Sequence, residues 1–146
     1  MTQRYQNYEI DEDPARIDFA RVHAWLAETY WSPGIARDRV ERAAAHSSLV
    51  LGAYDADGRQ VGYLRVISDR ATFAYVADVY VDEAHRGLAR ALVRFALSHP
   101  DHQGLRRWLL ATADAQGVYQ EVGFKPLPHP ERWMALIPAP TRLGAA

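Results

Sequence analysis

The chain has 146 residues, no cysteine and a formal net charge of -1 at pH 7. Its length suits one folding unit with a sizeable core, so residues 1–146 are expected to form a single domain with a loose tail from about residue 138. Without cysteine there are no disulfides, thiolate zinc sites or cysteine nucleophiles, and without a net positive charge there is no general attraction to nucleic acid or to an anionic membrane.

The beginning of the chain predicts neither export nor membrane insertion. Residues 1–13 are polar and charged where a signal peptide needs an apolar stretch, and no run approaches the roughly 20 apolar residues of a membrane span. A cytoplasmic location is therefore expected. Within this segment, residues 4–10 predict a short first strand, because Tyr5 alternates with polar neighbours.

Two helices are predicted next. Asp18 is a suitable N-cap for a first helix, whose apolar stripe recurs at steps of three and four residues. The stripe consists of Phe19, Val22, Leu26 and Tyr30. Asp38, followed by Glu41 three residues later, resembles a capping box that opens a second helix running to about residue 46.

The middle of the chain predicts three strands. Residues 49–54 and 61–67 form a hairpin, and the Asp57-Gly58 pair between them favours a turn with positive φ at the glycine. Residues 72–81 alternate as a third strand. Phe73, Tyr75, Ala77, Val79 and Val81 are predicted to point to one face, and Ala74, Val76, Asp78 and Tyr80 to the other.

The C-terminal part alternates between helix and strand. A helix follows Arg86-Gly87 and ends before His99-Pro100, and a short buried strand covers residues 107–112. A second helix over residues 115–122 is closed by Gly123. Residues 133–137 predict a last strand, after a proline-rich connection that contains Pro126, Pro128 and Pro130. This order predicts an α/β fold: a mixed, mostly antiparallel sheet of about six or seven strands with helices on both faces.

The segment from Asp78 to Ala91 carries the clearest chemical signal. A strand ends there in Arg86-Gly87 and leads directly into a helix, whose first turn exposes unpaired N–H groups and the positive end of its dipole. Small residues at Gly87, Ala89 and Ala91 would let a pyrophosphate approach the main chain. The alternative is that Arg86-Gly87 only turns the chain and that the alanines only favour helix.

Two motifs resemble the GNAT superfamily of N-acetyltransferases. Val79, Val81 and Arg86 match the family's Val-x-Val strand and its Arg/Gln-x-x-Gly-x-Gly/Ala phosphate loop. About 30 residues later, Tyr119 to Phe124 is similar to the family's Tyr-x-x-x-Gly-Phe. The resemblance covers most of the chain and implies the GNAT-like sheet described above.

The resemblance implies that acetyl-CoA binds as co-substrate, with the strand pairing to the pantetheine arm and the loop holding the phosphates. The implied cofactor-binding residues are Val79, Tyr80, Val81, Arg86, Gly87, Leu88, Ala89, Arg90 and Ala91. This chain has Ala89 where the family loop carries glycine. The alignment fits without a gap, or the loop is two residues short and Leu88 already lies inside the helix.

The implied reaction is direct transfer of an acetyl group to a primary amine, which requires a base, an acid and polarisation of the carbonyl. Tyr119 matches the family's general acid, or is a core tyrosine. Asp78 is expected to be the base, acting through a water, although a structural role for Asp78 and the competing carboxylate of Glu28 stay open. Tyr30 and Trp31, with Glu28, are expected to line the acceptor side, or to be core.

The resulting prediction is an acetyl-CoA-dependent N-acetyltransferase acting on a small-molecule or protein amine; the alternative is a catalytically weak CoA-binding or regulatory domain of the same fold. Partners in nucleic acid or membrane are not expected, whereas a homodimer is a frequent family assembly. None of the six histidines forms an HExxH motif, so no metal is expected. No Gly-x-Ser-x-Gly or P-loop lysine supports a hydrolase or NTPase.

Overall fold

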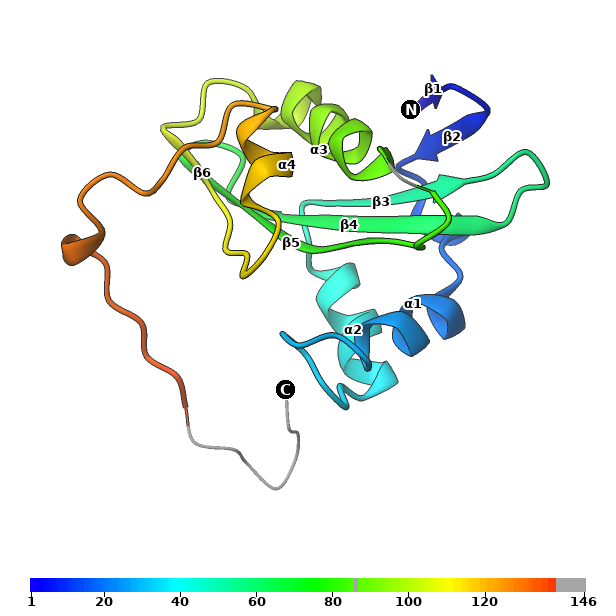
Figure 1. The fold of residues 1–146 in the computed structure, drawn as a ribbon, viewed down its shortest axis with the longest axis horizontal. Coiled ribbons are helices and arrows are strands. Elements are labelled where there is room, and N and C mark those ends of the chain that lie inside the picture. Colours follow the sequence, from blue (N-terminus) through cyan, green and yellow to red (C-terminus); the bar gives the residue numbers. More distant parts are fainter. Residues whose placement is uncertain (86, 139–146) are drawn as a thin grey trace.

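A six-stranded mixed sheet forms the centre of the molecule in a computed structural model that describes residues 1–85 and 87–138 (Figure 1). The strands follow the chain order across the sheet, and all neighbours are antiparallel except the last pair, which is parallel. They are β1 (Thr2–Tyr5), β2 (Tyr8–Asp11), β3 (Leu49–Tyr54), β4 (Gln60–Ser68), β5 (Phe73–Val81) and β6 (Arg107–Leu109). The predicted fold class is confirmed.

Helices cover both faces of the sheet. In Figure 1, α3 and α4 lie above it, and α1 and α2 lie below. They are α1 (Phe19–Leu26), α2 (Arg37–Ala45), α3 (Leu88–Ser98) and α4 (Gln116–Gln120), with short 3-10 turns at Pro14–Arg16, Pro100–His102 and Pro130–Arg132. Within residues 1–85 and 87–138, no helix has the length and apolar character needed to cross a bilayer.

A hydrophobic core lies on each face of the sheet because the side chains of the central strands alternate. Leu64 of β4 packs in the larger core beneath α3, together with Leu92 and Phe95 of that helix. Its neighbour Tyr63 points to the other face and belongs to the smaller core, between the sheet and the helices α1 and α2, which also contains Val22. These helices turn apolar stripes toward the sheet, as their sequences predict. The prediction is wrong for Tyr30, because α1 ends at Leu26 and Tyr30 lies in the loop that follows, 57% exposed.

The N-terminal region differs from its prediction in two places. A single strand over residues 4–10 is wrong, because β1 and β2 form a hairpin that turns at Gln6, whose φ is 54°. The predicted capping box of the second helix is also wrong. The residue that caps α2 is Ala36, which offers no side-chain bond, and Glu41 pairs with Arg37 instead. The N-cap at Asp18 is confirmed, since its carboxylate accepts from the Arg21 N–H at 3.1 Å.

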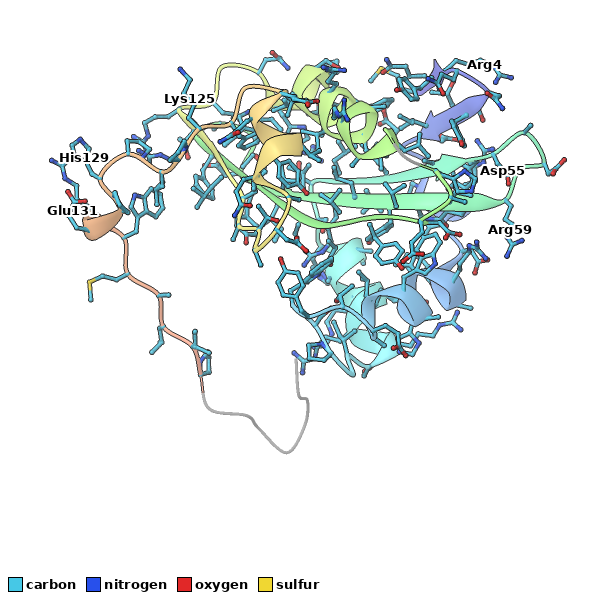
Figure 2. The ribbon with its side chains drawn as sticks, in the orientation of Figure 1. Arg4, Asp55, Arg59, Lys125, His129 and Glu131 are labelled. Carbon is cyan, nitrogen blue, oxygen red and sulfur yellow. The ribbon has the colours of Figure 1, made fainter. Side chains whose placement is uncertain are left out.

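The predicted last strand over residues 133–137 is wrong. After the proline-rich connection, residues 133–138 have no regular structure and run away from the sheet, as Figures 1 and 2 show, with Lys125, His129 and Glu131 labelled along the way. Met134, Leu136 and Ile137 are 97%, 91% and 86% exposed. The segment has strand-forming side chains but no neighbouring strand, and strand propensity depends on such pairing.

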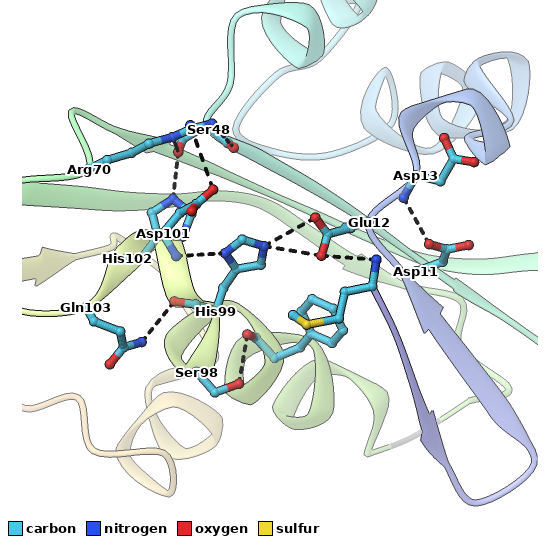
Figure 3. Close-up of polar contacts among 12 residues, drawn as sticks. Asp11, Glu12, Asp13, Ser48, Arg70, Ser98, His99, Asp101, His102 and Gln103 are labelled. Carbon is cyan, nitrogen blue, oxygen red and sulfur yellow. Dashed lines mark hydrogen bonds and ion pairs between the residues drawn. The ribbon is translucent and has the colours of Figure 1, made fainter.

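A cluster of polar groups connects the end of α3 to the sheet (Figure 3). His102 is 2% exposed, and its Nε2 lies 2.6 Å from the Ser48 hydroxyl at the start of β3. The ring of His99 stands beside it and bonds to Glu12, which also pairs with the N-terminal amine. The cluster thus fastens the N-terminus, β3 and α3 to one another.

Candidate active site

A bulge in β5, the fifth of the six strands, re-aims a carboxylate inside that strand. Tyr63 of β4 pairs with Tyr80, whereas Arg65 pairs with Ala77, so that Asp78 and Val79 together face one residue of β4. Asp78 has a φ of 53°, in the left-handed region. An extra residue of this kind bends a strand and re-aims its side chains.

The bulge overturns the predicted alternation of this strand. Val79 and Val81 pack against the core beneath α3, which also contains Ala74 and Val76. Strict alternation had predicted these two pairs of residues on opposite faces of the sheet. Tyr80 lies on the other face and stacks on Trp25 of α1 with ring centroids 4.9 Å apart. The regular period of two holds only as far as the bulge.

The Asp78 carboxylate is held by a donor on each oxygen. The Arg65 Nε donates to one oxygen at 2.7 Å, and the Trp31 indole N–H donates to the other at 2.9 Å. The Arg65 and Asp78 side chains are only 17% and 13% exposed. This pair therefore compensates its own charge and connects β4, β5 and the α1–α2 loop.

Beside the bulge, β5 and β6 part. They pair only from Phe73 with Arg107 to Tyr75 with Leu109, although β5 continues to Val81. A cavity of about 670 Å³ lies between the two chain segments beyond that point, with walls from residues 76–79 and from residues 110–115. It reaches from α2 on one side to Tyr119 of α4 on the other, and its size is typical of small-molecule sites.

Two tyrosines meet at this cavity. The Tyr30 hydroxyl accepts a hydrogen bond from the Ala113 N–H at 2.8 Å, so the α1–α2 loop is attached across the cavity to the segment after β6. Tyr119 lines the same space. Burial, with the nearby Tyr30 and Asp114, raises the pKa of the Tyr119 phenol above its ordinary value. Its hydroxyl is therefore protonated at neutral pH and can act as a proton donor.

The N-terminus of α3 lies at the end of β5. Gly87 caps it with a φ of 91°, and the helix begins at Leu88, whose side chain is fully buried. The first N–H groups of a helix have no partner within it. Arg90 forms an ion pair at 2.8 Å with Glu121, the residue after α4, and the buried Nε of Arg90 has no partner among the described residues. Arg86 lies outside the described residues.

The structure gathers some of the sequence-predicted residues and separates others. Those that line the cavity together are Tyr30, Trp31, Asp78, Val79 and Tyr119. The residues at and after Gly87 form a second group at the start of α3. Glu28 is exposed and does not line the cavity.

Sequence reasoning missed three charged residues that line the cavity: Arg39, Arg65 and Asp114. Arg65 could have been found from the sequence, because a charged side chain inside an otherwise apolar strand needs a partner of opposite charge. Arg39 left a weaker signal, because it precedes Val40 and lies four residues before Ala43 on a helix. Within the described part of the chain, no group of three or more His, Asp or Glu side chains could hold a metal ion.

Comparisons with known proteins agree on one family. The model of the acetyltransferase (GNAT) family matches residues 5–124. A Gibberella zeae protein described as a candidate acetyltransferase, FG08082, is 28% identical over 142 residues, covering 82% of this chain and 80% of that protein.

Solved structures give the same result. A candidate GNAT acetyltransferase from Xanthomonas campestris pv. campestris has a TM-score of 0.86 and 42% identity, covering 92% of this chain and 95% of its own. The Escherichia coli protein YhbS, a GNAT family N-acetyltransferase solved in complex with CoA, has a TM-score of 0.62 and 25% identity. That comparison covers 86% of this chain and 72% of YhbS.

Proposed function

The chain belongs to the GNAT acetyltransferase family, and from this membership we propose that it transfers an acetyl group from acetyl-CoA to the primary amine of a small acceptor in one direct step. One observation carries the proposal: the cavity between the parted strands brings a carboxylate, a protonated phenol and main-chain groups of β5 to the same space. Direct transfer needs those three elements together.

The residues present suit the donor. Main-chain groups of β5 from Val79 to Val81 would pair with the pantetheine arm, and an N–H among them would polarise the acetyl carbonyl. The free N–H groups at the start of α3, opened by Gly87, would hold the phosphates. The thioester supplies an activated acetyl group, and the complex of YhbS with CoA is consistent with this use of the fold.

Asp78 is proposed to receive the proton of the acceptor ammonium through a water. Each oxygen of its carboxylate holds one donor, from Arg65 or Trp31, and keeps a further lone pair for a second. The neutral amine then forms the new C–N bond while the C–S bond breaks. Tyr119 delivers its proton to the departing sulfur, and its raised pKa keeps that proton in place until then. The second proton that the attacking nitrogen loses as it becomes the amide then restores the Tyr119 phenol.

The alternative function, CoA binding with little or no catalysis, is favoured by one observation. The helix starts immediately after Gly87 with Leu88 buried in the core, so the connection that would enclose the phosphates is short. This alternative requires binding without turnover.

Replacing Tyr119 by Phe tests the proposal against the alternative. Acetyl-CoA should bind to the wild-type protein in a calorimetric titration, and free CoA should appear when a panel of amines is added. Tyr119→Phe should lower kcat by about 100-fold, the lower end of what a general acid contributes, with the affinity for acetyl-CoA unchanged. Binding without any turnover by the wild type would support the alternative, and equal turnover by both proteins would remove Tyr119 from the reaction.

A further inference from the structure

One side chain in the cavity carries a charge that nothing described in the structure compensates. Arg39 of α2 is half-buried and lines the cavity. The other two arginines of this helix pair with carboxylates four residues away, Arg37 with Glu41 and Arg42 with Asp38. Among the described residues, none forms an ion pair or a side-chain hydrogen bond with Arg39.

The other cation of the cavity is already neutralised. Arg65 donates to Asp78 at 2.7 Å, and the two side chains are largely buried together. The remaining positive charge therefore lies on the α2 side, among the apolar residues Ile35, Val40 and Ala43, which line the same space. Apolar walls reduce screening, so an anion that reaches Arg39 is attracted more strongly than it would be on an open surface.

The two carboxylates that line the cavity come from elements other than α2. Asp78 belongs to β5, and Asp114 lies in the segment between β6 and α4. None of the described residues donates a hydrogen bond to the Asp114 carboxylate. The main-chain N–H of Asp114 donates to the Thr112 hydroxyl. Because Asp78 is neutralised by Arg65, the charges of the cavity without a partner among the described residues are the Asp114 carboxylate, after β6, and the Arg39 guanidinium, on α2.

We infer that Arg39 binds an anionic group of the acceptor, so that the substrate class is a small amine that carries a carboxylate or a phosphate at the end remote from the reacting nitrogen. This inference rests on the proposed function. Arginine suits both groups, since its planar guanidinium donates two parallel hydrogen bonds to either of them. The ammonium of the same molecule would then lie toward the carboxylates, where the acetyl group is transferred.

The test compares pairs of acceptors with the same amine and linker, in which the remote group is either anionic or neutral. The probes are 4-(aminomethyl)benzoate against 4-(aminomethyl)benzamide, 5-aminopentanoate against 5-aminopentanamide, and 3-aminopropyl phosphate against 3-aminopropanol. Wild-type kcat/KM should be at least tenfold higher for the charged member of a pair, and the carboxylate and phosphate pairs identify which anion is preferred. Arg39→Gln should remove this preference, mainly by raising the KM of the charged member of each pair.

Two further variants separate binding from structure. Arg39→Lys should restore part of the preference, and Arg37→Gln, an exposed arginine of the same helix outside the cavity, should leave it unchanged. Equal wild-type values for charged and neutral members, or a preference that survives in Arg39→Gln, would overturn the inference.

A calorimetric titration of the charged probes without acetyl-CoA keeps the two proposals distinguishable. If no amine is acetylated, the proposed function fails. Binding of 4-(aminomethyl)benzoate or 3-aminopropyl phosphate that is lost in Arg39→Gln would still support the anion site, and no binding of any charged probe would refute it.

Discussion

Asp78 combines an unusual backbone conformation with two strong side-chain contacts. Residues other than glycine seldom adopt a positive φ, although aspartate tolerates it better than most. Here the conformation turns the carboxylate toward Trp31 and Arg65, away from the core beneath α3. The same two contacts fix the position of the carboxylate in the wall of the cavity.

Replacing Asp78 by Asn should destabilise the fold. The size of the side chain is kept, but the charge that compensates Arg65 is lost while that guanidinium stays largely buried. We expect the free energy of unfolding to fall by about 1–3 kcal/mol, measured by urea denaturation. Asp101→Asn is the matched control, because its pair with Arg70 is about half exposed on both sides and should be worth less than about 1 kcal/mol. Equal losses in the two variants would argue against a structural role for the Asp78 charge.

The sequence could identify Asp78 as a mid-strand carboxylate but could not give its direction. Strict alternation assigns it to the face of Ala74 and Val76, and only the pairing of β5 with β4 reveals the bulge that reverses the assignment. A bulge arises from contacts between strands that are distant in the sequence, so no local pattern marks it. The same reason hides Arg39, whose position in a cavity depends on where α2 packs.

At the level of elements, the turn after α3 depends on a buried histidine. Burial, together with the electrostatic effects of His99 and Arg70, lowers the pKa of His102 below its ordinary value, although Asp101 acts in the opposite direction. The folded protein therefore favours neutral His102, and its bond to Ser48 joins the Pro100–His102 turn to β3.

Acidification should weaken this attachment. Because the pKa of His102 is lower in the folded state than in the unfolded chain, the stability that it contributes is complete above about pH 6.5 and is lost as the pH falls toward the folded pKa. Urea midpoints at pH 8.0 and 5.5 should differ less in His102→Gln than in the wild type. The exposed His129 provides the control, since His129→Gln should retain the wild-type difference. An unchanged difference in His102→Gln would contradict the expectation.

Elements with their own capping and periodic signals could be predicted closely. The helix after Gly87 begins and ends where its sequence indicates, and Asp18 caps α1. The first hairpin was missed because its turn, Gln6-Asn7, lacks the glycine of the usual Asn-Gly or Asp-Gly pair. Local chemistry therefore determined the helices better than the strands at the edges.

At the scale of the whole molecule, the segment after the proline-rich connection contributes little to stability. Met134, Leu136 and Ile137 contact almost nothing, so burial gives them no stabilising effect. Replacing all three by Ser should change the free energy of unfolding by less than about 0.5 kcal/mol, measured by urea denaturation. Leu92→Ala in the core beneath α3 is the comparison, with an expected loss of about 2–5 kcal/mol.

A loss of more than about 1 kcal/mol in the triple variant would contradict this prediction. It would mean that the segment pairs with the sheet, as its sequence suggested. The prediction of a strand from residues 133–137 relied on side-chain type alone, whereas a strand also needs a neighbour with free backbone groups. Side-chain type therefore proved sufficient for β3, β4 and β5, which lie between other strands, and insufficient at the end of the chain.

The parting of β5 and β6 gives the molecule an edge inside its sheet. Unpaired backbone on an outer edge invites other chains to add as strands, and proteins commonly block such edges to avoid aggregation. Here the free stretch of β5 is recessed between the segment after β6, the α1–α2 loop and α4, and the Tyr30 bond to Ala113 closes part of the entrance. Under the proposed function, the chain that pairs with this stretch is not a strand of another protein but a thin ligand that carries amide groups. The fold thereby keeps backbone hydrogen-bonding groups available to a slender ligand while shielding them from another protein.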